Sequence, residues 1–326
     1  MRVPPVPSLT IPALLCVGLA LSAAPASAAD APRTVLDAVE PVDVSVQGQR
    51  VAWLRPASAP SRTGTVRTVQ AVVLDAPGGT PRVLSAKLPD FADSVALGSD
   101  GNGRTVLTIG SRGRDVVVRA DGSGPARRLR GQTSKDEATV MRAGRIAFLR
   151  TSRGTTTLRF ATAAGRPSKL VRTVPREYQG LRLALGARDA IALHAYRPRD
   201  VGIGNIVWLM RPGKKVVRLT SQSTGGASDN GIGALTVSAD GSRFAVTRFN
   251  IGGGHPSDVQ RFSATSGKRV SVRPATAVPN VDALDEYVLD DGRSVVTPIE
   301  TFNCARPGDP DAQPGAPACL GLDLVG

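Results

Sequence analysis

The sequence predicts an all-β fold, a six-bladed β-propeller with four antiparallel strands in each blade. Three observations support this prediction. A short pattern, in which a strand, a glycine-containing turn and a second apolar strand follow one another, recurs six times. The copies are spaced by about 50 residues. Further strand-like segments fill the space between the copies, and no segment has the apolar period of a helix.

The repeat is clearest at residues 236–247, which have the sequence TVSADGSRFAVT. Similar segments lie at 287–297 and 95–108, and weaker ones at 44–54, 140–149 and 183–193. An Asp-Gly pair between two apolar runs favours a tight hairpin, because glycine tolerates a positive φ. The second strands are expected to begin near Val51, Val106, Ile146, Ile191, Phe244 and Val295, at spacings of 55, 40, 45, 53 and 51 residues.

Closure of the ring is predicted from the two ends of the chain. Each of the first five repeats is followed by two further strand-like segments, whereas the last repeat is followed by only one, at residues 320–325. An unassigned strand lies near the start, at residues 33–37. We expect it to complete the last blade, because that would hide the edges that an open array leaves exposed.

Residues 1–28 are predicted to be a cleaved signal peptide, followed by a single propeller domain over residues 29–326. Arg2 supplies a positive start, residues 11–21 are apolar, and Ala26 and Ala28 flank a serine at a small-x-small cleavage site. An apolar run of this length is too short to span a bilayer, which takes about 20 residues. A lipidated Cys16 is the alternative, but Leu15 stands where a small residue is needed. The expected location is therefore extracytoplasmic, either periplasmic or extracellular.

Two cysteines follow the expected cleavage site, Cys304 and Cys319. In an exported protein such a pair predicts a disulfide, which would close a loop rich in alanine, glycine and proline. In the chain-entropy model, closing a loop of about 15 residues stabilises a fold by roughly 3 kcal/mol. The alternative is a metal site, but neither His194 nor His255 is near in sequence. We predict no metal and no cofactor.

The chain is strongly basic, with 41 lysines and arginines against 27 acidic residues and a formal net charge of +14. A basic exported protein attracts anionic polymers such as envelope glycans or polyphosphate. The alternative is a compositional bias that replaces lysine by arginine, although such a bias does not explain why the acidic residues fail to balance the charge. With aromatic residues at 4% of the chain, a stacking platform for bases is not expected, so nucleic acid is not the expected partner.

The segment SADGSRFAV at residues 238–246 resembles the repeat of TolB-type, WD-like propellers, in which a Ser-Pro-Asp-Gly turn precedes an apolar strand. The resemblance extends over the mature chain as a repeat pattern and implies six blades. Only the second, fifth and sixth repeats carry the Asp-Gly pair, and none carries the proline. The resemblance therefore implies the fold class and does not transfer the partners of TolB.

A ligand site is predicted where the second strands connect to the third, because these connections open on one face of a propeller. The connections are expected at residues 55–67, 112–115, 150–156, 197–204, 248–258 and 301–318. Five of them begin with arginine: Arg55, Arg112, Arg150, Arg197 and Arg248. Guanidinium groups bind carboxylate, sulfate or phosphate in a bidentate manner. The alternative is that these arginines are simply solvated. His255, in a glycine-rich connection, is a further candidate, or part of a loop without a ligand.

No catalytic motif is present: the sequence has neither a Gly-x-Ser-x-Gly elbow nor a His-Glu-x-x-His helix. We therefore expect a secreted, non-catalytic and monomeric propeller that serves as a binding or scaffold module for an anionic envelope polymer or a protein partner. The alternative is a propeller lyase or hydrolase that acts on an acidic polysaccharide. That alternative predicts carboxylates or a histidine from separate blades at the mouth of the central channel.

Overall fold

The computed structural model describes residues 33–57, 68–111, 114–129, 132–133, 135–163, 168–197, 204–222, 229–251, 258–275, 283–300 and 321–326. All of them belong to one compact unit that extends from Pro32 to the C-terminus. The predicted signal peptide, both cysteines, Arg112 and His255 lie outside the described residues. None of the described residues forms a helix that is long and apolar enough to cross a membrane.

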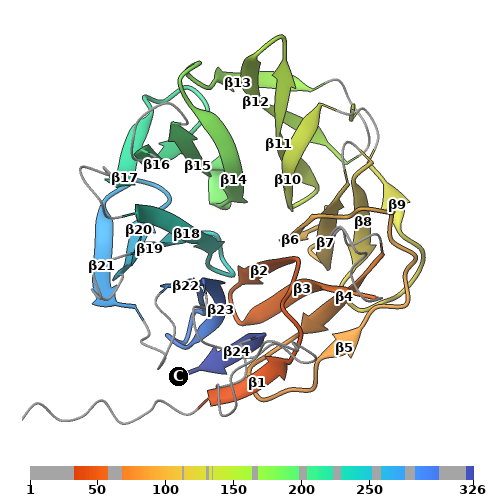
Figure 1. Cartoon of the computed structure of the whole chain (residues 1–326). Helices are drawn as coiled ribbons and strands as arrows, with labels where there is room; N and C mark the ends of the chain where they lie inside the picture. The colour runs from red at the N-terminus through yellow and green to blue at the C-terminus, as the bar shows by residue number, and fades with distance from the viewer. Residues whose placement is uncertain are drawn as a thin grey trace, which may run out of the picture. The chain divides into compact units, whose positions relative to one another are not determined.

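The described residues form an all-β propeller, in which β-sheets are arranged in a ring (Figure 1). Four of the sheets have four strands. They are β6 (Ser94–Ser99), β7 (Thr105–Gly110), β8 (Val116–Arg119) and β9 (Arg127–Arg128); β10 (Asp136–Arg142), β11 (Arg145–Ser152), β12 (Thr155–Thr162) and β13 (Lys169–Thr173); β14 (Gln179–Leu185), β15 (Ile191–Arg197), β16 (Gly204–Met210) and β17 (Val217–Gln222); and β22 (Ala283–Val288), β23 (Ser294–Glu300), β24 (Leu322–Val325) and β1 (Arg33–Asp37). A single short 3-10 helix among the described residues, Ala187–Asp189, lies between β14 and β15.

The fifth sheet has eight strands in the order β21-β20-β19-β18-β2-β3-β4-β5. Its strands are β2 (Asp43–Gln47), β3 (Arg50–Pro56), β4 (Val69–Leu74), β5 (Arg82–Val83), β18 (Asp229–Val237), β19 (Arg243–Ile251), β20 (Asp258–Ser263) and β21 (Arg269–Pro274). Its two halves are joined by a single parallel pair, Val237 with Gln47. The described residues therefore form five sheets rather than the six separate ones that the repeat predicts, because this pair connects two innermost strands.

The positions of the strands agree closely with the repeat. The second strand of each unit begins at Arg50, Thr105, Arg145, Ile191, Arg243 or Ser294, in each case at or one residue before the predicted start. The strand predicted at residues 33–37 is β1, which pairs antiparallel with β24 from Arg33–Val325 to Asp37–Leu322. An N-terminal strand and the C-terminal strand therefore share one sheet.

One predicted connection is wrong. Residues 150–156 are not a long connection. The strand β11 continues to Ser152 and β12 begins at Thr155, so a tight turn of two residues joins them. Arg153 and Gly154 both have positive φ, 51° and 70°. This is the conformation that a two-residue hairpin needs to match the twist of its strands. The sequence Arg-Gly at this place therefore indicates a hairpin.

The core lies between neighbouring sheets of the ring. Side chains that alternate along a strand point to opposite faces of its sheet. Along β3, Ala52 and Leu54 pack with residues of β6 and β7, whereas Val51 and Trp53 pack with residues of β23 and β24. The innermost and second strands are consequently largely buried on both faces, and several of their polar side chains, such as Thr108, His194 and Glu286, are buried with them.

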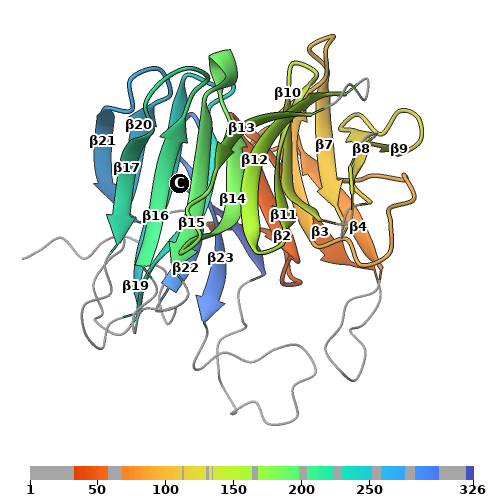
Figure 2. The same ribbon diagram turned by 90° about the horizontal axis from the view of Figure 1, so that it is seen from above.

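The propeller has two distinct faces, because the corresponding strands of successive sheets run in the same direction from one face to the other (Figure 2). We call the face on which the innermost strands β2, β6, β10, β14, β18 and β22 begin the mouth face. The turns that join these strands to the second strands lie on the opposite face, which we call the turn face. Since each second strand is antiparallel to its innermost strand, the second strands end on the mouth face.

Candidate functional site

The structure places the described members of the predicted arginine set on one face. Arg55, Arg150, Arg197 and Arg248 each lie at or near the end of the second strand of their unit, and hence at the mouth face. Register confirms their equivalence in two of the units, where Arg55 is opposite Gln70 and Arg248 is opposite Asp258 on the third strand. Arg112 and His255 lie outside the described residues.

Two of these arginines are held by carboxylates of the protein itself. Arg150 donates from Nε and Nη2 to the two carboxylate oxygens of Asp136, at 2.6 and 2.8 Å. The Asp136 side chain is fully buried, and this bidentate bond raises the pKa of Arg150. Arg248 forms the same kind of pair with Asp258, with Nε 2.7 Å from Oδ1. Their guanidinium groups fasten adjacent strands of one sheet to each other.

The other two arginines also have partners. Arg55 donates to Oε1 of Gln70 at 3.3 and 3.2 Å and lies 3.8 Å from a carboxylate oxygen of Asp37. The guanidinium of Arg197 lies over the ring of Tyr178, 5.9 Å from its centre. All four described arginines thus have interactions within the protein, and their side chains are not a set of free guanidinium groups.

The channel mouth is a second place where charged side chains meet. A small cavity of about 80 Å³ is lined by residues of β2, β6, β10, β14, β18 and β22, the innermost strands. Arg182 of β14 donates from Nη1 to the hydroxyl of Tyr287 at 3.0 Å, and its Nη2 lies 3.6 Å from Oδ2 of Asp285. Asp43 of β2 lines the same cavity and accepts a 2.8 Å bond from the backbone N–H of Val95 in β6. We call Asp43, Arg182, Asp285 and Tyr287 the channel cluster.

Burial dominates the electrostatics of the channel cluster. It raises the pKa of Asp43 from 3.8 to about 6, against the opposing effects of Arg182 and of the N–H of Val95. It also raises the pKa of Asp285, against the effect of the same arginine, and the pKa of Tyr287. Asp43 is therefore partly protonated near neutral pH, as a general acid or base would be. The cluster has the groups that the enzymatic alternative predicted at the channel mouth.

His194 lies behind this cluster, opposite Arg182 in the register of β15 and β14. It is buried, and its Nε2 is 2.9 Å from Oδ1 of Asn205. Burial lowers the pKa of His194 to about 4, and the charge of Arg182 acts in the same direction. His194 is therefore neutral at physiological pH and belongs to the packing of its sheet.

Protonation of Asp43 should make stability depend on pH. Its pKa is about 6 in the folded chain and 3.8 when unfolded, so the folded state binds the proton more tightly and stability falls as the pH rises from about 4 to about 6. An asparagine still accepts from Val95 but carries no charge. We expect Asp43→Asn to stabilise the protein above pH 6 by about 1–3 kcal/mol. Thermal unfolding of both proteins at several pH values measures this; parallel curves for the two would contradict it.

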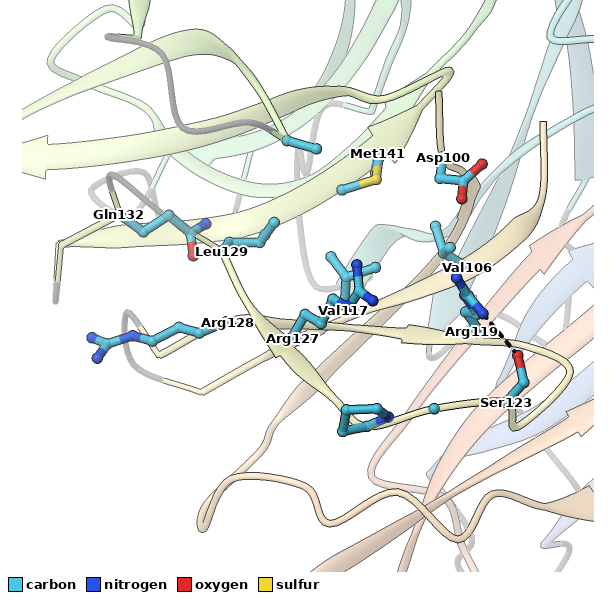
Figure 3. A pocket seen from close by; sticks show the side chains of 13 residues that line it. Asp100, Val106, Val117, Arg119, Ser123, Arg127, Arg128, Leu129, Gln132 and Met141 are labelled. Atoms are coloured by element: carbon cyan, nitrogen blue, oxygen red, sulfur yellow. Dashed lines mark hydrogen bonds between the residues drawn. The ribbon is translucent and has the colours of Figure 1, made fainter. Parts of the chain in front are cut away.

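The third place is a large pocket of about 870 Å³ between two neighbouring sheets, β6–β9 and β10–β13 (Figure 3). The outer strand beside it, β9, has only two residues, as β5 has, whereas β13, β17 and β21 have five or six. The floor is apolar: Val106, Leu129 and Met141 belong to one buried cluster, with Val117 packed against it. Ala163, an exposed residue directly after β12, also lines the pocket.

Polar groups surround this apolar floor. Arg119, Arg127 and Arg128 line the pocket, together with Asp100 and Gln132. Arg119 donates to the hydroxyl of Ser123 at 3.2 Å, and Figure 3 shows Arg128 extending away from this pair. Neither Arg127 nor Arg128 forms an ion pair or a side-chain hydrogen bond with another residue of the described ranges. Two free guanidinium groups therefore stand at the edge of an apolar hollow.

Basic residues dominate the outer strands of the ring as well. The strands β5, β9, β13, β17 and β21 contain no acidic residue, and each contains at least one arginine or lysine. Those without a carboxylate partner among the described residues are Arg127, Arg128, Lys169, Arg172, Arg218 and Arg269, which we call the basic rim. Figure 1 shows β9, β13, β17 and β21 on the outside of the ring. Like charges on an exposed edge also prevent sheets from pairing edge to edge.

The comparisons with known proteins concern the fold. No family model and no curated protein matches the sequence. TolB from Acinetobacter baumannii is similar in structure, with 12% identity, a TM-score of 0.46, and coverage of 77% of this chain and 61% of TolB. The periplasmic gluconolactonase PpgL of Pseudomonas aeruginosa has 15% identity, a TM-score of 0.44 and coverage of 88% of both chains.

A prolyl endopeptidase is also similar, with 14% identity and a TM-score of 0.43 over 81% of this chain. The chain spans 41% of that enzyme, so it covers less than two thirds of the length of both TolB and the endopeptidase. The predicted resemblance to TolB-type propellers is confirmed at the level of the fold. At these identities the likeness extends to nothing further.

Sequence analysis did not single out the residues of the channel cluster or of the pocket. Asp43 and Arg182 are the only charges of β2 and β14, and Asp285 stands beside Glu286 in β22, so no local pattern shows that the ring brings them together. For Arg127 and Arg128 an available signal was their place in the fourth strand of a unit, where a side chain is exposed.

Among the described residues, no three His, Cys, Asp or Glu side chains are grouped so that they could hold a metal ion.

Proposed function

We propose that this chain is a secreted, non-catalytic binding module for an anionic polymer of the cell envelope, which it contacts through the basic rim. One observation carries the proposal: the outer strands β5, β9, β13, β17 and β21 contain cations without carboxylate partners among the described residues and no acidic residue, and Asp37 of β1 is the one acid in the outer strands. Exposed guanidinium and ammonium groups in the same strands repel one another, and a polyanion along the rim would relieve this repulsion. The predicted signal peptide supports a place outside the cytoplasm.

The mouth-face arginines contribute less to this proposal than the sequence suggested. Arg150 and Arg248 already have carboxylates as bidentate partners. A polymer carboxylate would have to displace Asp136 or Asp258 and leave that aspartate without its partner, which costs more than binding to a free arginine. The rim offers five arginines and one lysine that have no carboxylate partner among the described residues, so we place the contact there.

A salt series tests this proposal. Binding of the purified protein to polygalacturonate should weaken at least tenfold between about 50 and about 200 mM salt, because the contacts are between exposed charges. The pair Arg218→Ala and Arg269→Ala should weaken binding further at low salt and flatten the salt dependence. The matched control is Arg104→Ala with Arg243→Ala, which removes two exposed arginines that lie outside the outer strands and have no carboxylate partner in the described part of the chain. Binding that is independent of salt, or that both pairs weaken equally, contradicts a role for the rim.

We also infer six blades closed by β1. The eight-stranded sheet would be two blades, β2–β5 and β18–β21, joined by the one pair Val237 and Gln47. In each half the strand order is that of the separate four-stranded sheets. The sixth blade would be β22, β23, β24 and β1, so that the first and last strands of the mature chain lie side by side and no blade ends in an unfinished sheet.

A second function, a lyase or hydrolase that acts on an acidic polysaccharide, is supported by the channel cluster. Asp43, with a pKa of about 6, and Arg182 lie at the same small cavity and could exchange a proton and hold a substrate carboxylate. Incubation with polygalacturonate should then release shorter saccharides, and Asp43→Asn should abolish the release. Binding without any change in polymer length over long incubation would leave the binding module as the function.

A further inference from the structure

We propose that the pocket between the sheets β6–β9 and β10–β13 binds a segment of an acidic saccharide, with its carboxylates at Arg119 and Arg127 and its hydroxyls toward Gln132. This rests on the proposed function, since it names the chemistry that the anionic polymer presents to one site. The rim alone would attract any polyanion, whereas this pocket combines charge, apolar surface and a buried acceptor.

The size of the pocket fits such a segment. Its volume of about 870 Å³ lies within the range of about 300–1,000 Å³ for sites that bind small molecules. The floor of Val106, Leu129 and Met141 is apolar and can cover the C–H face of a sugar ring. It contains no aromatic ring, so a nucleobase would find nothing on which to stack.

The charges of the pocket select an anion. Arg119, Arg127 and Arg128 line it together with a single carboxylate, that of Asp100. The Asp100 carboxylate accepts hydrogen bonds from the backbone N–H groups of Asn102 and Arg104 at 2.8 and 2.9 Å, so it stabilises the turn in which Asp100 lies. Arg127 has no carboxylate partner among the described residues, and a ligand carboxylate would supply one.

Gln132 distinguishes a saccharide from other anions. Its Nε2 donates to Asp115 at 2.8 Å and to Thr139 at 2.9 Å, which fixes the amide and leaves Oε1 buried with no partner in the described part of the chain. Figure 3 shows the side chain of Gln132 extending toward Leu129. A buried acceptor without a donor is unfavourable, and a sugar hydroxyl would satisfy it. The acyl chain of a lipid and inorganic phosphate at neutral pH offer poorer donors.

The test is calorimetric titration of the full-length mature protein with trigalacturonic acid and with its neutral methyl ester. We expect the acid to bind and the ester to bind at least tenfold more weakly. Ala163→Trp should fill the pocket without changing any charge and reduce the affinity for the acid at least tenfold. Arg127→Ala should weaken it about tenfold, whereas Arg269→Ala, which removes an equal charge from another outer strand, should change it less than about twofold.

The outcomes separate the two proposals. If polygalacturonate binds with the expected salt dependence but Ala163→Trp has no effect on the trisaccharide, the pocket is not the site and the rim proposal stands. If the ester binds as well as the acid, the assigned carboxylate contacts are wrong. If neither polymer nor trisaccharide binds, the proposed function itself fails. Ala163 is exposed in the native protein, so a tryptophan there should not disturb the core. An unfolding temperature of Ala163→Trp equal to that of the wild type shows that the variant is folded.

Discussion

Arg150→Ala is expected to destabilise the protein by about 3–5 kcal/mol while leaving its affinity for anionic polymers unchanged. The Asp136 side chain is fully buried, and Arg150 is its only cationic partner among the described residues. Removing the guanidinium leaves a carboxylate in the core with the backbone N–H of Thr133, at 2.8 Å, as a remaining donor. One uncompensated buried charge is a large fraction of the stability of a single domain.

Chemical denaturation of Arg150→Ala beside Arg128→Ala measures this effect. Arg128 is exposed and unpaired, so its loss should change the free energy of unfolding by less than about 0.5 kcal/mol. The double variant Asp136→Asn with Arg150→Met removes both charges and should recover most of the lost stability, because a neutral amide can still accept from Thr133. If Arg150→Ala were instead as stable as the wild type and weaker in polymer binding, Arg150 would be a ligand-binding residue, as the sequence suggested.

The different fates of these residues show what the sequence could and could not predict. The repeat located the second strands to within one residue, because each follows a glycine-containing turn whose conformation is local. It placed Arg150 and Arg248 at the start of connections, whereas both lie inside β11 and β19, two and three residues before these strands end. It could not show that their partners are Asp136, on the preceding strand, and Asp258, on the following one. Pairing across strands depends on register, and register is set by packing rather than by the turn alone.

The channel cluster was even harder to predict, because its contacts also join strands that are distant in the sequence. Arg182 and Tyr287 are 105 residues apart, and no local pattern connects them. Their meeting requires the whole ring, with β14 and β22 on different sides of one channel. The eight-stranded sheet has a similar origin. The parallel pair of Val237 and Gln47 forms because two innermost strands approach each other. The number of repeats in the sequence does not predict this approach.

Trp53→Ala is expected to destabilise the protein by about 3–5 kcal/mol, because Trp53 is almost fully buried between β3 and the sheet that contains β1 and β24. Its Nε1 donates to Oδ2 of Asp37 at 2.8 Å, and Asp37 is the last residue of β1. The contact thus joins β1, in the sheet with β24, to β3 of the eight-stranded sheet. Trp53→Phe keeps most of the ring but removes the donor, and should cost about 1–3 kcal/mol.

A double-mutant cycle turns this contact into a test of ring closure. In the chain with Asp37→Ala, the acceptor is absent, so Trp53→Phe should cost markedly less than in the wild type. The difference, an interaction energy of about 1–3 kcal/mol, exists only if β1 docks beside β24 in solution and brings Asp37 to the indole. Equal costs of Trp53→Phe in both backgrounds would mean that the N-terminal strand does not complete the last blade. Trp53 also packs among side chains of β23 and β24, so its replacement has effects beyond the bond to Asp37. The control is the same cycle with Val35→Ala in place of Asp37→Ala. Val35 is an exposed residue of β1, so this cycle should show no coupling.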